Sequence, residues 1–198
     1  IVLDLPRPAV LSGCGGRVGV ALGSEVVAGM KTICRDCGCT GFMCFLGAFQ
    51  LLLSRYSRSE EVVVGVAHAS NSVAMRLDLS TGTKGDGDDD ADLSFRDLLG
   101  RVRAMVEGAF AHSGLPFHKV VEALRRGGHI DAESGGRNPV FQAMLAYDDN
   151  MDESAGETPM EDFELMLHLS TSSDGGLSGS LAYSLSLIHI SEPTRLTM

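Results

Sequence analysis

The sequence predicts an α/β fold in which a mixed sheet is flanked by helices. Segments with strand-type and helix-type patterns follow one another in the order strand, two helices, two strands, two helices, three strands. Hydrophobic residues make up 44% of the 198 residues and aromatic residues 6%, which is ordinary for a globular core. The longest apolar run, residues 42–53, is shorter than the roughly 20 residues of a membrane-spanning helix. We therefore expect a packed α/β domain and no membrane partner.

The N-terminal half is expected to contain a linker, three strands and two helices. The first sixteen residues hold two prolines and three glycines, which predicts a linker strap before a domain at residues 17–184. The pattern of residues 17–22 alternates, Ser24 is suited to cap a helix, and residues 62–67 are β-branched enough for a buried strand. The expected elements are a strand at 17–22, a helix from 24 to about 37, a helix at about 41–55, and strands at 62–67 and 72–79.

An acidic segment at residues 81–92 separates these elements from the next helix. It is rich in Gly and Asp and poor in apolar residues, so we expect a surface loop. Five aspartates in and just after this segment fall near the ligand positions of a calcium-binding loop. Ala91, however, stands where such a loop needs Gly, and Asp97 is shorter than the usual Glu. No metal is assigned to it.

Two helices and three strands are expected after the acidic segment. Ser94 and Asp97 form a variant of the capping box, which predicts a helix ending near Ser113 and Gly114. Pro116 suits the first turn of a second helix through Leu124, because a backbone N–H would have no partner there. The expected strands are at residues 140–148, 163–170 and 177–184.

Charge and cysteine content limit the possible functions. The net charge of −10 and the pI near 4.9 oppose binding to nucleic acid, whose affinity comes from Lys and Arg. Four of the five cysteines lie within residues 34–44, but their spacing lacks the two separated ligand pairs of a structural zinc site. We expect buried thiols in a cytoplasmic protein and no bound metal. A phosphate-binding glycine loop and a G-x-S-x-G motif are also missing from the sequence.

Four separate stretches resemble one family. Residues 137–147, RNPVFQAMLAY, are similar to the "RNPLFQVMF" motif of condensation domains of nonribosomal peptide synthetases, and HSGLPFHKVVEAL at residues 112–124 is similar to their "HQDLPFERLVEAL". The stretches GFMCFLGAFQLLLSRYSRSEEVVVGV and LSFRDLLGRVR resemble segments that precede two of the family's core motifs. The resemblances follow the family's order from about Leu3 to Tyr183.

The resemblance implies the C-terminal lobe of a chloramphenicol-acetyltransferase-like condensation domain. Such domains form an amide bond between acyl or aminoacyl thioesters held on phosphopantetheine arms. The arms belong to carrier proteins, so no cofactor is expected to bind this chain directly. The implied partners are the missing N-terminal lobe, peptidyl or acyl carrier proteins and an adenylation domain. The positions that match family motifs, with structural or channel roles, are Asn71, Arg76, His112, Pro116, Phe117, Arg137, Asn138 and Pro139.

Departures from the family pattern qualify this expectation. The HHxxxDG motif, which holds the family's acid/base histidine, has no match in the sequence, so we expect the chain alone to be inactive. The family's "GFFV" segment is also missing before Asn71. The family would use Arg76 to brace the motif aspartate across the lobe interface. His118 stands where the family has Glu and receives no chemical role.

The C-terminal residues depart from the family pattern as well. LSLIHISEPTR, residues 185–195, resembles a translated sequencing adapter, so residues 185–198 are expected to be an assembly artefact. Two alternative functions stay open: a non-catalytic condensation-like module that docks carrier proteins, and a fragment of an acyl-CoA-dependent acyltransferase. Because half of a two-lobed fold exposes the face meant for its partner, we expect poor solubility of the isolated chain.

Overall fold

The structure, a computed structural model, describes residues 15–68, 71–80, 93–130, 137–148, 163–172 and 175–184. The expected strap up to residue 14, the acidic segment at 81–92 and the tail at 185–198 lie outside these residues. Gly15 and Gly16, which we expected in the strap, belong to the first strand.

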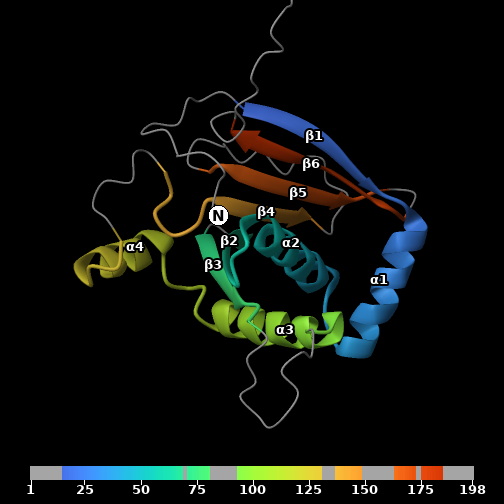
Figure 1. The fold of residues 1–198 in the computed structure, drawn as a ribbon, viewed down its shortest axis with the longest axis horizontal. Coiled ribbons are helices and arrows are strands. Elements are labelled where there is room, and N and C mark those ends of the chain that lie inside the picture. Colours follow the sequence, from blue (N-terminus) through green and yellow to red (C-terminus); the bar gives the residue numbers. More distant parts are fainter. Residues whose placement is uncertain are drawn as a thin grey trace, which may run out of the picture.

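A six-stranded mixed sheet forms the centre of the molecule (Figure 1). Its order is β1-β6-β5-β4-β2-β3. The three central strands β5, β4 and β2 are mutually parallel, whereas the remaining neighbours pair antiparallel. The strands are β1 (Gly15–Leu22), β2 (Glu61–His68), β3 (Asn71–Asp78), β4 (Ala143–Asp148), β5 (Leu165–Thr171) and β6 (Leu177–Ser184). The expected mixed α/β sheet is confirmed.

The described residues also form four helices: α1 (Ser24–Cys37), α2 (Gly41–Ser57), α3 (Phe95–Ala111) and α4 (Phe117–Arg126). The Thr40 hydroxyl accepts a hydrogen bond from the Met43 N–H at 3.2 Å, which begins α2. Ser94 caps α3 by accepting from the Asp97 N–H at 3.2 Å, as the capping-box variant predicts. Helix α1 ends at Gly38, whose φ of 63° is the left-handed conformation that glycine adopts without strain.

Several element ends differ from the sequence-based expectation. Gly23, not Ser24, is the N-cap of α1, and it makes no side-chain cap bond. Pro116 is the N-cap of α4 rather than part of its first turn, because its ψ of 135° is not helical. Helix α3 ends at Ala111, about two residues before the expected Ser113. Local patterns locate elements well but their ends poorly, since the last turns depend on neighbouring contacts.

The core occupies both faces of the sheet. Because successive strand residues point to opposite faces, Ala143 and Leu145 pack with α2 and α3 in the main cluster, whereas Met144 packs in a second cluster on the other face. The second cluster also contains Phe141 and Phe163, which come from the segments that precede β4 and β5. Both faces of the central strands therefore carry core residues, as is usual for parallel strands.

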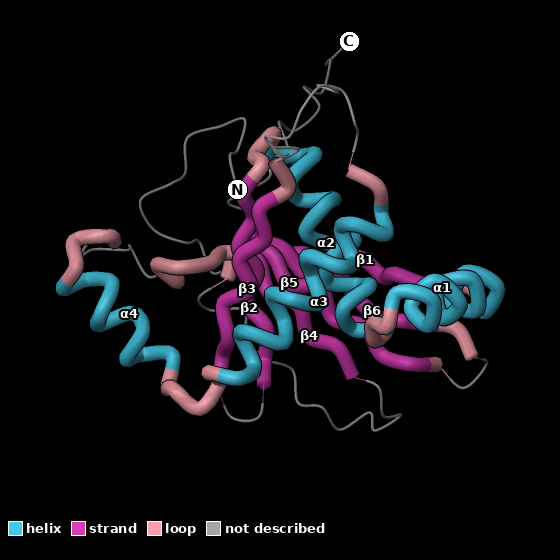
Figure 2. The backbone as a smooth tube through the Cα atoms, turned by 90° about the horizontal axis from the view of Figure 1, so that it is seen from below, coloured by secondary structure: helices cyan, strands magenta, loops and turns pink. Residues whose placement is uncertain are grey.

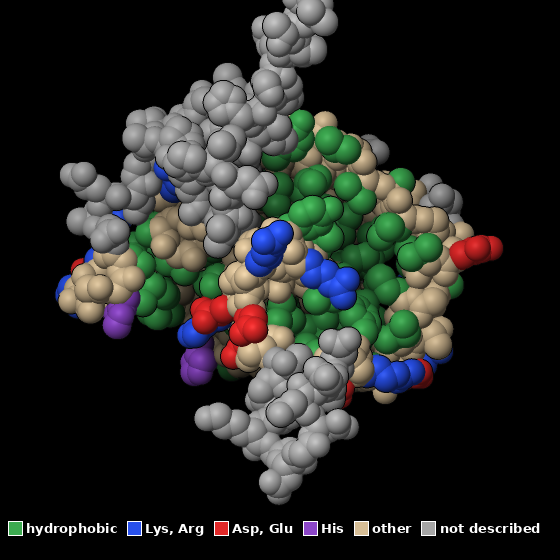
Figure 3. All heavy atoms as spheres, viewed as in Figure 1, with side chains coloured by type: hydrophobic (Ala, Val, Ile, Leu, Met, Phe, Trp, Pro, Cys, Tyr) green, Lys and Arg blue, Asp and Glu red, His purple; other side chains and the backbone are tan. Residues whose placement is uncertain are grey.

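The helices cover the sheet unevenly. Helices α2 and α3 lie over the β2–β3 side, α1 stands at the opposite end, and α4 projects away from the body (Figures 1 and 2). On the face seen in Figure 3, apolar side chains gather in front of β1, β6 and β5, between α2 and α1. Three large apolar side chains, one each on β1, α1 and α2, are more than half exposed: Val18 (53%), Val26 (57%) and Leu52 (51%).

No single helix among the described residues is long and apolar enough to span a membrane. Only α1 and α2 taken together, bent by 103°, reach the length and composition of a span.

Candidate functional site

The loop between α3 and α4 is held by one side chain from the sheet. Asn71, the first residue of β3, donates from Nδ2 to the carbonyl oxygens of Ser113 at 2.9 Å and Leu115 at 2.8 Å. Its Oδ1 accepts from the Phe117 N–H at 2.9 Å. Pro116 has no N–H, and the Phe117 N–H is among the donors that a helix start leaves without an intrahelical partner. Asn71 thus satisfies the start of α4 from outside the helix.

Phe117 connects α4 to the second core cluster. Its ring lies 5.2 Å from the ring of Phe141, and the rings of Phe141 and Phe163 stack at 5.7 Å. Phe117 is half-buried. The row of rings passes beneath β2, where a Cβ atom on Gly65 would overlap the Phe141 ring. Gly65 is thus needed for the close approach of this row to the sheet.

Arg137 and Asn138 shape the turn that faces α4. Arg137 Nε donates to Glu164 Oε1 at 2.9 Å, and the two side chains are 13% and 1% exposed. Asn138 Oδ1 accepts from the N–H groups of Val140 at 3.0 Å and Phe141 at 3.1 Å, which closes an Asx-type turn. This turn presents Pro139 and the arginine to α4. We call residues 137–139 the Arg137 turn.

A groove of about 750 Å³ lies between α4 and the Arg137 turn. We call it the α4 groove. Its volume is within the range of ligand-binding clefts, about 300–1,000 Å³. Its lining combines apolar and charged side chains: Ser72, Phe117, His118, Val121, Glu122, Arg125, Arg126, Arg137, Asn138, Pro139 and Phe163.

The groove unites four of the eight expected motif positions. Phe117 and the three residues of the Arg137 turn line it directly, and Asn71 and Pro116 adjoin it through the α4 start. His112 lies apart, exposed at the C-cap of α3, where its N–H donates to the Ala109 oxygen at 3.2 Å.

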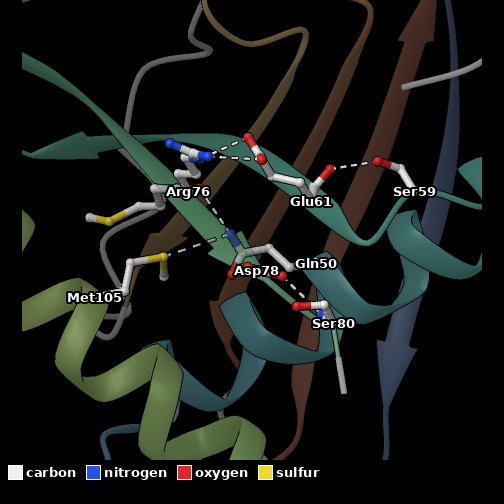
Figure 4. A network of polar contacts seen from close by, with 8 residues as sticks. Gln50, Ser59, Glu61, Arg76, Asp78, Ser80 and Met105 are labelled. Carbon is white, nitrogen blue, oxygen red and sulfur yellow. Dashed lines mark hydrogen bonds and ion pairs between the residues drawn. The ribbon is translucent and has the colours of Figure 1, made fainter. Parts of the chain in front are cut away.

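Arg76 lies away from the groove. Its Nε and Nη2 atoms meet the two carboxylate oxygens of Glu61 at 2.7 and 2.8 Å, as Figure 4 shows. The hydrogen bond to Glu61 raises the pKa of Arg76, and the charge of Glu61 adds to it. The side chains are 70% and 50% exposed, so this pair contributes little to stability. The brace across a lobe interface, expected from the family, stays a prediction.

The histidines do not form an acid/base pair within the described part of the chain. His68 stacks on Phe110 with ring centroids 4.3 Å apart, and His118 is exposed at the groove. None of the side chains of His68, His112, His118, His129 and His168 hydrogen-bonds to a described residue.

The four cysteines that the structure describes lie at the junction of α1, α2 and α3. Cys34, Cys37, Cys39 and Cys44 are free thiols, and the described residues contain no group of three or more side chains arranged to hold a metal. Burial raises the pKa of Cys44 to about 12, with the neighbouring Cys34 adding to the effect. Burial also raises the pKa of Cys39. The thiols of Cys39 and Cys44 therefore stay protonated at neutral pH and pack as small apolar groups.

Sequence reasoning missed Arg125, which lines the groove, and Glu164, which pairs with Arg137 behind it. Glu164 lies at the start of an alternating stretch, where a polar residue usually faces solvent, and only the fold reveals its burial against Arg137. Arg125 lies in a strongly amphipathic helix, and that pattern could have indicated an exposed basic face.

Comparisons with known proteins identify the class to which this fold belongs. The sequence model of the Condensation domain matches residues 2–198. The chain therefore belongs to the condensation-domain family, with the chloramphenicol-acetyltransferase-like α/β fold of that family. The matched range includes residues 185–198, for which an adapter origin stays a prediction.

Relatives among the peptide synthetases agree with this assignment. One subunit of the linear gramicidin synthase of Brevibacillus parabrevis is 33% identical over 221 residues, covering 98% of this chain and 4% of that protein. Another subunit of the same synthase is 39% identical over 156 residues, covering 72% of this chain and 2% of that protein. The chain thus spans only a small part of the length of these relatives.

Solved structures agree on the fold. A crystal structure of a four-domain nonribosomal peptide synthetase bound to AMP and glycine has a TM-score of 0.77 at 21% identity, covering 96% of this chain and 16% of that one. The X-domain from teicoplanin biosynthesis has a TM-score of 0.76 at 23% identity, covering 95% of this chain and 46% of that one.

Proposed function

We propose that this chain is the C-terminal lobe of a condensation domain in a nonribosomal peptide synthetase. In this role it takes part in forming an amide bond between an acyl or peptidyl thioester and the amine of an aminoacyl thioester. Both substrates are carried on phosphopantetheine arms of carrier proteins, and an adenylation domain loads the amino acid. The setting is the cytosol, which suits the four free thiols.

The observation that carries this proposal is the convergence of the family-like stretches. The helix of the HSGLPFHKVVEAL stretch and the RNP turn, which are separate in sequence, form the two walls of the α4 groove. The strand start at Asn71 fixes the loop between α3 and α4. The same unit covers 46% of the chain of the teicoplanin X-domain, as one lobe of a two-lobed domain would.

The chemistry divides between the two lobes. The attacking amine needs a group that removes or orients its proton, and the family's HHxxxDG histidine supplies it. The described histidines of this chain hold no such arrangement, so we assign the acid/base histidine to the N-terminal lobe. This chain supplies a rigid wall for the substrate channel and the surface in front of β1, β6 and β5, which packs against that lobe (Figure 3).

A chimera tests the proposal. The C-terminal lobe of an active condensation domain that carries HHxxxDG is replaced by residues 1–184, and the dipeptidyl product on the carrier protein is measured by mass spectrometry. We expect product from the chimera, no product from residues 1–198 alone, and no product when the motif histidine is changed to alanine.

Three other results would argue against the proposal in different ways. Product from the chain alone would refute the division of roles. A folded chimera that binds both carriers without making product would favour the non-catalytic docking module instead. Transfer from free acyl-CoA, without a carrier, would favour the acyltransferase alternative.

A further inference from the structure

The corner where α1 meets α2 brings two buried thiols together. Cys34 lies in the last turn of α1 and Cys44 in the first turn of α2, and the two helices are bent by 103° at this corner. With Leu99 of α3 the two cysteines form a small core cluster, in which Cys34 is 5% and Cys44 1% exposed. The bend therefore places the ends of two helices so that each contributes one thiol to the same cluster.

The thiols of Cys34 and Cys44 are in contact. After burial, the largest influence on the pKa of Cys44 comes from Cys34, through its charge and through a side-chain hydrogen bond. Cys34 Sγ also donates to the carbonyl oxygen of Thr40 at 3.6 Å, which holds this thiol inside the corner. Sulfur atoms at hydrogen-bonding distance need only a modest side-chain movement to reach the S–S bond length of about 2 Å.

The other two described cysteines are placed differently. Cys37 and Cys39 are half-buried, and Cys39 Sγ donates to the carbonyl oxygens of Cys37 and Leu99, each at 3.6 Å. Both act on Cys44 more weakly than Cys34 does. Since the described residues contain no group of three or more side chains arranged to hold a metal, the four thiols do not form one ligand set. Cys34 and Cys44 are thus a pair within the cluster.

We infer that Cys34 and Cys44 are a reversible redox modification site, at which a small-molecule disulfide such as glutathione disulfide oxidises the two thiols to one Cys34–Cys44 disulfide. The thiolate of one cysteine attacks a sulfur of the oxidant and releases one small thiolate, which takes up the proton that the cysteine has lost. The second cysteine then displaces the other small thiolate in the same way. Two protein thiols are oxidised to one disulfide, and one small disulfide is reduced to two thiols. The inference does not depend on the condensation activity proposed above.

The positions of the two cysteines at helix ends determine how the reaction proceeds. Both thiols are buried, so an oxidant reaches them only when the corner opens, and helix ends are the parts of a fold that open most easily. We therefore expect slow oxidation that is limited by this opening. Once formed, the bond joins α1 to α2 across residues 38–40 and opposes the same opening. It also fixes the position of Val26 on α1 relative to Leu52 on α2, two exposed apolar side chains.

Equilibration with glutathione tests the inference. Residues 1–198 are incubated with mixtures of reduced glutathione and glutathione disulfide, quenched with acid, alkylated and digested, and peptide mapping by mass spectrometry assigns each bond among the five cysteines of the chain. We expect a Cys34–Cys44 disulfide that dithiothreitol reverses. Because the fold holds the pair together, its equilibrium constant of formation should be at least about tenfold larger in the folded chain than in the chain unfolded in urea. Hydrogen exchange should slow at residues 38–40 in the oxidised chain.

Two variants that each remove one thiol from the same corner separate the pair from its neighbours. Cys39→Ala should form the Cys34–Cys44 disulfide like the unaltered chain, whereas Cys44→Ala should form no disulfide with Cys34 and gain no protection at residues 38–40. Circular dichroism verifies that both variants are folded. If Cys44→Ala is not folded, Cys34→Ala replaces it, because that change removes the other half of the same pair.

Three results would overturn the inference. A mapped bond that joins Cys34 to Cys39, or any pair other than Cys34 and Cys44, would refute the assignment of the pair. Equal equilibrium constants in the folded and the urea-unfolded chain would show that the fold does not favour the bond. Only mixed disulfides with glutathione, without a bond between two cysteines of the chain, would show that the corner does not bring the two sulfurs together.

Discussion

Asn71 Oδ1 accepts a hydrogen bond from the Phe117 N–H at 2.9 Å, so the first residue of β3 holds the first residue of α4. Two further bonds from the same side chain reach carbonyl groups of the preceding loop. One polar side chain thereby sets the position of a helix that has little other contact with the body, and with it the width of the α4 groove.

Asn71→Ala should loosen the start of α4. The change removes three hydrogen bonds and leaves a half-buried N–H and two carbonyl groups to water, which should lower the free energy of unfolding by about 2 kcal/mol. Urea unfolding measures the loss, and hydrogen exchange should show faster exchange at Phe117. Ser72→Ala, at the next position of β3, is the control and should change little. Equal exchange at Phe117 in both variants would contradict the role of Asn71.

Removing Arg137 should destabilise the chain strongly. Arg137→Ala leaves the carboxylate of Glu164 buried without this partner, at a cost of about 3–5 kcal/mol. The double variant Arg137→Met/Glu164→Leu should be more stable than Arg137→Ala, because no charge stays buried. Chemical unfolding of the single and double variants measures the difference. If the double variant lost as much as the sum of the two single changes, the ion pair would not be the cause.

Gly65→Ala should disturb the row of aromatic rings. The added methyl group overlaps the ring of Phe141, and overpacking of this kind costs about 1–3 kcal/mol. Gly19→Ala is the control, since no atom lies within 4 Å of a Cβ at that strand position. Adding Phe141→Leu to Gly65→Ala should recover part of the loss in a thermal unfolding experiment. A thermal midpoint for Gly65→Ala equal to that of Gly19→Ala would contradict the close approach.

Alkaline pH should destabilise the fold through Cys44. Its pKa is raised from 9.0 to about 12 by burial, so between these values the unfolded chain loses a proton that the folded chain keeps. Stability therefore falls as pH rises above about 9, by about 1 kcal/mol per pH unit for a single group. Urea unfolding at neutral pH and at a pH about one unit above the ordinary thiol pKa should show a smaller decrease for Cys44→Ala than for the unaltered chain. Identical decreases would show that Cys44 is not the group responsible.

Local patterns predicted the helices and strands, because periodicity and capping residues act over a few positions. Ser94 caps α3 as the capping-box variant indicates, and the β-branched run 62–67 is a strand. Pro116 shows the limit of this reasoning: a proline fits both the N-cap and the first turn, and the contact with Asn71 favours the former.

Contacts between distant residues were beyond local reasoning. Asn71 bonds to groups 42 to 46 residues later in the chain, and Arg137 pairs with a residue 27 positions away. Neither pairing leaves a periodic pattern, because each depends on the order of strands in the sheet. The resemblance to a family indicated which positions matter, but only the fold shows that Phe117 and the Arg137 turn share a groove, whereas Arg76 pairs with Glu61 elsewhere.

Complex formation with a separately produced N-terminal lobe tests the central claim most directly. Residues 1–198 are mixed with the N-terminal lobe of a condensation domain, and mass is measured by analytical ultracentrifugation together with hydrogen exchange. We expect a one-to-one complex with new amide protection in β1, β5 and β6, while Val18→Glu/Leu52→Glu abolishes the complex and leaves the chain folded. A chain that stays monomeric and soluble alone, and gains no protection when the N-terminal lobe is added, would contradict the assignment of this protein as one lobe of a condensation domain.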